Sequence, residues 1–156
     1  MDDKVTLCRE KVTDYVVNYN NRKFVFLGAK AKAMSKKEVP LEVYEWLSSS
    51  TKALINGELI LLESDKEKKE ELLDYIVERE EYESNALTRE EIITILKGNM
   101  SVFKKGLEGI TSESTKKQVL DIAKAEKIEN SNKQKFLKTW YYGEDSKLSI
   151  EDIFGE

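Results

Sequence analysis

The sequence predicts an α+β fold, in which a small β-rich module with one helix is followed by an α-helical module. In the first third, short runs of β-branched and aromatic residues alternate with turn residues, as is typical of strands. In the second half, apolar residues recur at helical spacing between capping residues. Residues 63–91, which lie between these parts, hold 12 acidic and 5 basic side chains. We therefore predict a β-rich module over 1–63, an acidic connecting helix over 64–86, and a helical module with a C-terminal tail over 87–156.

The first predicted element is a β-hairpin formed by two apolar runs within residues 12–27. Asn20 and Asn21 separate the runs, and asparagine tolerates the positive φ of a tight turn better than most residues. A short third strand is expected over residues 31–34. These segments account for the sheet on the N-terminal side of the chain's only proline.

That proline, Pro40, is expected in the first turn of a helix, where its missing N–H is not needed. Leu41, Tyr44 and Leu47 give this helix an apolar stripe that can cover the sheet. After a polar break, Asn56-Gly57 between apolar runs predicts a second hairpin.

The helical part contains readable start and stop signals. Thr88-Arg-Glu-Glu91 is a capping box that opens a helix, and Lys97-Gly98 is expected to end it with the glycine in a left-handed conformation. Three further helices are expected, the first capped by Ser101, the second by Ser112 or Ser114, and the last ended by Gly143.

Composition restricts the chemistry. The chain has no histidine and one cysteine, Cys8, so it lacks the usual parts of zinc, haem, histidine-base and Cys-His sites. The acidic run over residues 78–83 lacks the spacing and glycine of a calcium loop. We therefore expect no enzyme activity, no metal and no cofactor. No apolar run is long enough for a membrane span, and the start lacks the core of a signal peptide, so we expect a cytoplasmic protein or one packaged from the cytoplasm.

Aromatic and apolar residues near the C-terminus are the candidate protein interface. Trp140, Tyr141 and Tyr142 are adjacent on one helix and cannot all face inward, so at least one of the tyrosines is expected to face solvent or a partner. In the tail, Ile153 and Phe154 are apolar enough to dock either on the chain's own module or on a neighbour.

Lysines suggest a different partner. Around the first hairpin, basic and aromatic residues interleave, a pattern that can bind single-stranded nucleic acid, although it is also typical of the solvated face of a sheet. The residues concerned are Arg22, Lys23, Lys30, Lys32, Lys36 and Lys37, with Tyr19, Phe24 and Phe26. The acidic balance of the whole chain disfavours non-specific DNA binding.

Two stretches resemble known families. Residues 12–62, with Val39-Pro-Leu-Glu-Val-Tyr-Glu-Trp-Leu47 and Asn56-Gly-Glu-Leu-Ile-Leu, resemble small N-terminal β modules of bacteriophage structural proteins. The stretch from Leu87 to Gly98, with the segments that follow, is similar to helical C-terminal modules of phage virion proteins. The later segments are also similar to helix-extended loop-helix modules related to SAP and LEM domains, with the two helices over Lys116 to Lys127 and Asn132 to Tyr142. In that family basic residues of the second helix contact DNA, which implies such contacts for Lys133, Lys135 and Lys138.

These observations favour a non-enzymatic structural or adaptor protein, part of a bacteriophage capsid or tail, that contacts other subunits or itself. We expect it in the virion after assembly in the host cytoplasm. The alternative is a small nucleic-acid-binding or regulatory module that uses the lysine-rich C-terminal helices.

Overall fold

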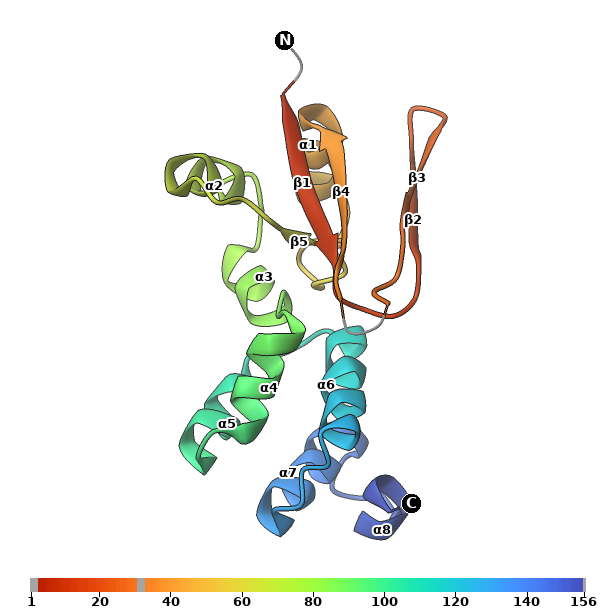
Figure 1. Ribbon diagram of the computed structural model, residues 1–156, viewed down its shortest axis with the longest axis vertical. Helices are drawn as coiled ribbons and strands as arrows, with labels where there is room; N and C mark the ends of the chain where they lie inside the picture. The colour runs from red at the N-terminus through yellow and green to blue at the C-terminus, as the bar shows by residue number, and fades with distance from the viewer. Residues whose placement is uncertain (1–2, 31–32, 156) are drawn as a thin grey trace.

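The structure, a computed structural model, describes residues 3–30 and 33–155 and confirms the α+β fold (Figure 1). In chain order the elements are β1 (Lys4–Arg9), β2 (Tyr15–Tyr19), β3 (Arg22–Phe26), β4 (Ser35–Pro40), α1 (Leu41–Ser50), β5 (Ile60–Leu61), α2 (Lys66–Leu73), α3 (Arg79–Asn85), α4 (Arg89–Lys97), α5 (Met100–Glu108), α6 (Glu113–Ala125), α7 (Ser131–Tyr142) and α8 (Ile150–Phe154).

The main sheet has three antiparallel strands in the order β4-β1-β5. Its centre, β1, was not predicted, although Val5 and Leu7 are fully buried in it. Helix α1 packs against β4 and β1. Cys8 is buried in β1 as a free thiol, the small apolar role that an isolated cysteine most often has.

The predicted first hairpin is confirmed as β2 and β3, which pair only with each other among the described strands. Asn20 and Asn21 both have positive φ, 49° and 63°, as the turn requires. The strand expected over 31–34 is misplaced: positions 31–32 lie outside the described residues, and Ala33 makes only an isolated bridge. The strand that follows is β4, which ends at Pro40. The proline is the N-cap of α1 rather than part of its first turn.

The expectation of a hairpin at Asn56-Gly57 is wrong. Gly57 has a positive φ of 68°, so the turn is present. The segment directly before it is α1 with the turns that follow this helix, and β5 after it pairs with β1. Residues 51–58 form a compact series of turns that leads back into the sheet.

The acidic segment is two helices, not the single helix expected over 64–86. Helices α2 and α3 are separated by residues 74–78, and the second runs in a new direction (Figure 1). The break lets Leu72, Ile76 and Tyr82 all reach the interior. The segment thus contributes to the N-terminal core instead of only connecting two parts.

Among the C-terminal helices, the capping box at Thr88, the N-cap at Ser112 and the stop at Gly143 are confirmed. Two details are wrong. Gly98 ends α4 with a φ of −72°, outside the left-handed region, and Asn99 rather than Ser101 caps α5.

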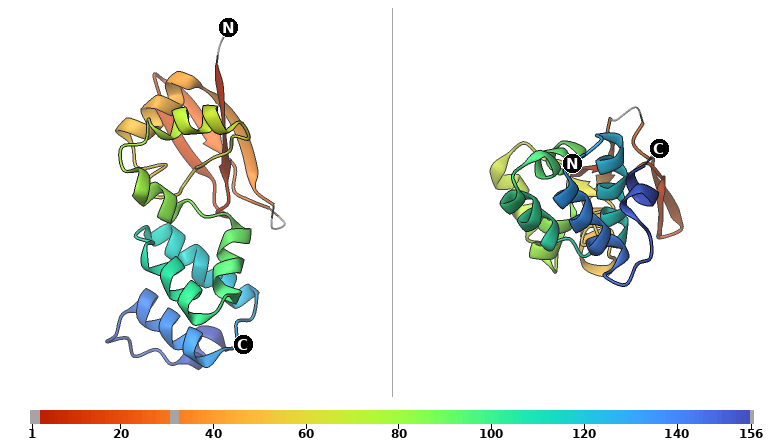
Figure 2. Two further views of the ribbon diagram at one scale, coloured as in Figure 1. Left: turned by 90° about the vertical axis from the view of Figure 1, so that its left-hand side faces the viewer. Right: turned by 90° about the horizontal axis from the view of Figure 1, so that it is seen from below.

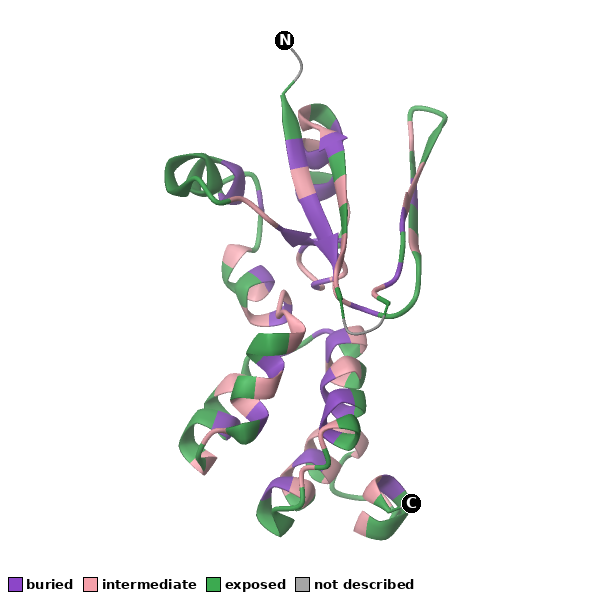
Figure 3. Ribbon diagram, viewed as in Figure 1, coloured by how far each residue is buried: buried purple, intermediate pink, exposed green. Residues whose placement is uncertain are grey.

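Buried side chains form two separate clusters. The first cluster comprises apolar residues from Val5 to Tyr82 and lies between the sheet, the hairpin and helices α1–α3. The second cluster comprises residues from Ile92 to Leu137 and is enclosed by helices α4–α8. The two clusters follow each other along the long axis of the molecule (Figures 2 and 3). The contact between them is therefore a defined junction.

Candidate functional site

The junction of the two clusters is held mainly by polar side chains. Asn85, at the end of α3, is fully buried and joins both sides. Its Nδ2 donates to the carbonyl of Ile55 at 2.9 Å and to Thr111 Oγ1 at 3.0 Å. Its Oδ1 accepts the backbone N–H groups of Thr111 and Ser112 at 2.9 and 3.1 Å. One amide side chain therefore connects the turns after α1 with the start of α6.

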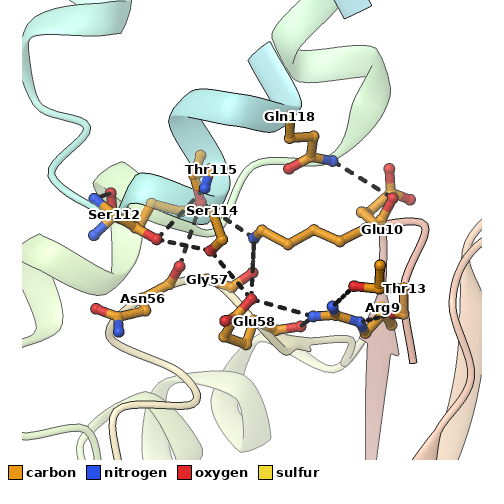
Figure 4. A network of polar contacts seen from close by, with 12 residues as sticks. Arg9, Glu10, Thr13, Asn56, Gly57, Glu58, Ser112, Ser114, Thr115 and Gln118 are labelled. Carbon is orange, nitrogen blue, oxygen red and sulfur yellow. Dashed lines mark hydrogen bonds and ion pairs between the residues drawn. The ribbon is translucent and has the colours of Figure 1, made fainter. Parts of the chain in front are cut away.

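A second group of contacts lies beside it, where β1 ends (Figure 4). Lys11 Nζ donates to the carbonyl of Gly57 at 2.5 Å and to Thr115 Oγ1 at 3.1 Å, so it also connects the two clusters. Arg9 donates to the carbonyl of Glu58 at 2.8 Å and pairs with its carboxylate at 3.3 Å. Ser114 donates to the same carboxylate at 3.1 Å. Arg9 and Lys11 thus share one carboxylate, that of Glu58, and backbone carbonyls accept from both cations.

This arrangement is a structural joint between the two clusters. A hollow of about 400 Å³ adjoins it, lined by residues that include Arg9, Lys11 and Glu58. Within the described part of the chain, however, no buried side-chain nitrogen or oxygen lacks a hydrogen-bond partner. Of the donors that line the hollow, Arg9 and Lys11 are already hydrogen-bonded to the protein.

Burial of Lys11 makes stability depend on pH. Desolvation lowers the pKa of Lys11 from 10.5 to about 8, even though Glu58 opposes the shift. Between these values the unfolded chain holds a proton that the folded chain has lost, so stability rises with pH. We expect the free energy of unfolding to rise by about 1 kcal/mol from roughly pH 7.5 to roughly pH 9.

Urea denaturation over this range measures the rise, and Lys11→Met should remove it. Above about pH 9 the rise is opposed, because burial raises the pKa of Cys8 from 9.0 to about 11 and the unfolded chain releases that proton first. If the free energy of unfolding depended on pH in the same way for the unmodified chain and for Lys11→Met, the assignment of the rise to Lys11 would be wrong.

Part of the candidate aromatic interface packs against the rest of the chain. Trp140 is half-buried and donates from Nε1 to the carbonyl of Leu107 at 3.2 Å. Tyr141 and Tyr142 are half-buried and contact each other edge to face. Ile153 is only 5% exposed, and Phe154 packs on the second cluster. The tail therefore docks on its own module, and Ile153 is not available to a partner.

The structure places the three candidate DNA-contacting lysines differently. Lys135 is exposed and Lys138 half-buried on α7, but Lys133 is buried. Its Nζ donates to the carbonyls of Leu96 and Gly98 at 2.7 and 2.6 Å and lies 5.4 Å from the ring centre of Phe103. The implied DNA contact by Lys133 is thus contradicted, because this ammonium group caps the C-terminal end of α4.

Replacing Lys133 with methionine should lower the free energy of unfolding by about 2–3 kcal/mol, because two carbonyls lose charge-assisted donors. Lys135→Met, on the same helix but exposed, should change it by less than about 0.5 kcal/mol. Urea denaturation of both variants makes the comparison, and equal losses would argue against the capping role.

The aromatic side chains of the hairpin pack partly against the protein itself. Tyr19 and Phe24 pack against the first cluster and Phe26 is buried in it. Tyr19 lies against Trp46, with 5.1 Å between ring centres, and Arg22 stacks over Phe24. These contacts occupy part of each ring, and nucleic-acid binding through this surface stays a prediction.

Sequence reasoning missed the opposite face of the hairpin. Val16 pairs with Val25 across the strands, on the side away from the aromatic residues. Val16 is 46% exposed, and at the base of the hairpin Val12 and Leu27 are 80% and 51% exposed. The signal was present in the alternation of Tyr15, Val16 and Val17, which must turn one valine outward. We define Val16, Val25 and Leu27 as the hairpin face.

In residues 3–30 and 33–155, no group of three or more carboxylate, cysteine or histidine side chains could hold a metal ion. Within the same ranges, no helix has the length and apolar character needed to cross a membrane.

Comparison with known families gives two matches. Residues 3–78 match the family model described as the YonA N-terminal domain, and residues 88–148 match the one described as the YonA C-terminal domain. Together these ranges include most of the chain. YonA is a phage-type (prophage) protein name, so the matches indicate a phage-related protein. No significant match was found among curated proteins or among solved structures.

Proposed function

We propose that this chain, which belongs to the YonA family through both of its domains, is a non-enzymatic structural or adaptor protein of a phage particle that acts through contacts with other protein subunits. The observation that carries the proposal is the hairpin face. Solvent-exposed apolar side chains gathered on one face are typical of protein interaction sites. The hairpin also stands at the side of the molecule, where a neighbouring subunit can reach it (Figure 1).

The architecture supports this role in a second way. The structural joint connects the two separately packed clusters through Asn85 and Lys11, so the two clusters are held against each other. An adaptor needs such an arrangement, because it must present surfaces to different neighbours in a defined geometry.

The test is the protein content of purified particles. Phage particles whose genome encodes this chain are purified on a density gradient. The amount of the chain is then measured by mass spectrometry and compared with that of a host cytosolic protein. We expect a constant amount of the chain per particle while the host protein disappears. Recovery of the chain only in the soluble fraction would overturn the proposal.

A matched pair of variants connects the result to the hairpin face. Val16→Glu places a charge on that face, while Val102→Glu places one at a similarly exposed valine of α5. The first variant should be depleted from particles and the second retained. In the alternative function, nucleic-acid binding, Lys135 and Lys138 remain the candidate DNA contacts. Salt-sensitive DNA binding that is lost when both become alanine would replace the present proposal.

A further inference from the structure

We infer that copies of this chain associate head to tail, with the hairpin face of one copy docked on the acidic surface around the α2–α3 turn of the next. This inference rests on the proposed function, since it names a second copy as one partner of the same hairpin face. It follows from two exposed surfaces with apolar centres and opposite charge.

The hairpin face has a basic edge. Lys23 follows the same side of β3 as Val25, and it is exposed. Lys30 is exposed just beyond the base of the hairpin. Among the described residues, neither lysine has a carboxylate within ion-pair distance. Lys23 is thus an uncompensated cation on the same side of the hairpin as Val16 and Val25.

The second surface has the opposite charge around a similar apolar centre. Val77, in the turn between α2 and α3, is 66% exposed, and Tyr75 is 41% exposed. Glu71, Glu78 and Glu80 are exposed nearby in the sequence, and within the described ranges none of them forms an ion pair. We call this set the acidic surface. Its charge agrees with the excess of acidic residues over 63–91.

The two surfaces cannot satisfy each other within one molecule. Helix α2 and the hairpin lie on opposite sides of β1 and β4, α2 to the left and the hairpin to the right (Figure 1). Contact between copies is therefore heterologous, and each added copy leaves one of each surface free. Such contacts build rings when the rotation closes and filaments when it does not.

The experiment measures mass by light scattering across protein concentration and at two salt levels. The unmodified chain should exceed its monomer mass of 18.0 kDa increasingly as concentration rises. The association should weaken at about 1 M salt, where charges are screened beyond about 3 Å. Val16→Glu, which brings a like charge to the acidic surface, and Val77→Lys, which brings one to the hairpin face, should each weaken self-association about tenfold or more.

Mixing the two variants separates a head-to-tail contact from other modes. The Val77→Lys copy keeps an unmodified hairpin face and the Val16→Glu copy an unmodified acidic surface, so the mixture should associate again. A symmetric hairpin-to-hairpin contact would gain nothing from mixing. Val102→Glu is the control for added charge, and circular dichroism confirms folding of every variant.

Monomeric behaviour at all concentrations, or a mixture that stays monomeric, would overturn the inference. These failures differ from failure of the proposed function. A monomeric chain that is nevertheless present in purified particles refutes self-association and leaves the structural role intact. A chain that assembles in solution but is absent from particles supports self-association and refutes the structural role.

Discussion

Replacing Asn85 with alanine is expected to lower the free energy of unfolding by about 3–5 kcal/mol, far more than most single substitutions. The side chain is fully buried and makes four hydrogen bonds, three of them to backbone groups. Alanine would leave the carbonyl of Ile55 and the N–H groups of Thr111 and Ser112 without their partner. Each buried polar group left unpaired costs about 1–3 kcal/mol.

The same substitution should reduce cooperativity, because Asn85 joins the two clusters. Urea unfolding followed by far-ultraviolet circular dichroism and by tryptophan fluorescence should give one transition for the unmodified chain. For Asn85→Ala the fluorescence should show two transitions, since Trp46 packs on the first cluster and Trp140 on the second. Asn132→Ala, at an exposed position of α7, is the control and should remain within about 0.5 kcal/mol. A loss below about 1 kcal/mol for Asn85→Ala would contradict its role in the joint.

Local signals explain which parts of the fold could be predicted. The capping box at Thr88, the N-cap at Ser112 and the Asn20-Asn21 turn depend on residues within a few positions of each other. In contrast, β5 has two residues and exists only through its register with Leu7 and Cys8 in β1. Nothing within a two-residue strand reveals that partner.

The structural joint could not be predicted either, because its contacts connect residues that are far apart in the sequence. Asn85 bonds to residues 26 to 30 positions away, and Lys11 bonds to Thr115, which is 104 positions away. In the sequence, Lys133 looks like any exposed lysine. Its burial is favourable only because its ammonium group donates to the carbonyl groups at the end of α4. The hairpin face is different, because strand alternation already required one face of the Val16-Val25 pair to be exposed.

The second large effect is expected at Gly57, where the turn after α1 approaches the end of α3. A Cβ atom there would lie 2.1 Å from the backbone oxygen of Asn85, and the φ of 68° is itself unfavourable for other residues. Gly57→Ala should therefore lower the free energy of unfolding by about 3 kcal/mol or more. Thermal or urea denaturation measures the loss.

Asn21→Ala separates the two causes of this loss. Asn21 has a nearly equal φ of 63° but is exposed at the tip of the hairpin, so its replacement should cost only about 1 kcal/mol of backbone strain. The difference between the variants then measures the close approach of Gly57 to Asn85. Because the carbonyl of Gly57 also accepts Lys11, displacing this turn loosens both groups of contacts at the joint. Equal losses would mean that the turn and α3 can separate freely, and the fixed spacing that an adaptor requires would then lack its structural basis.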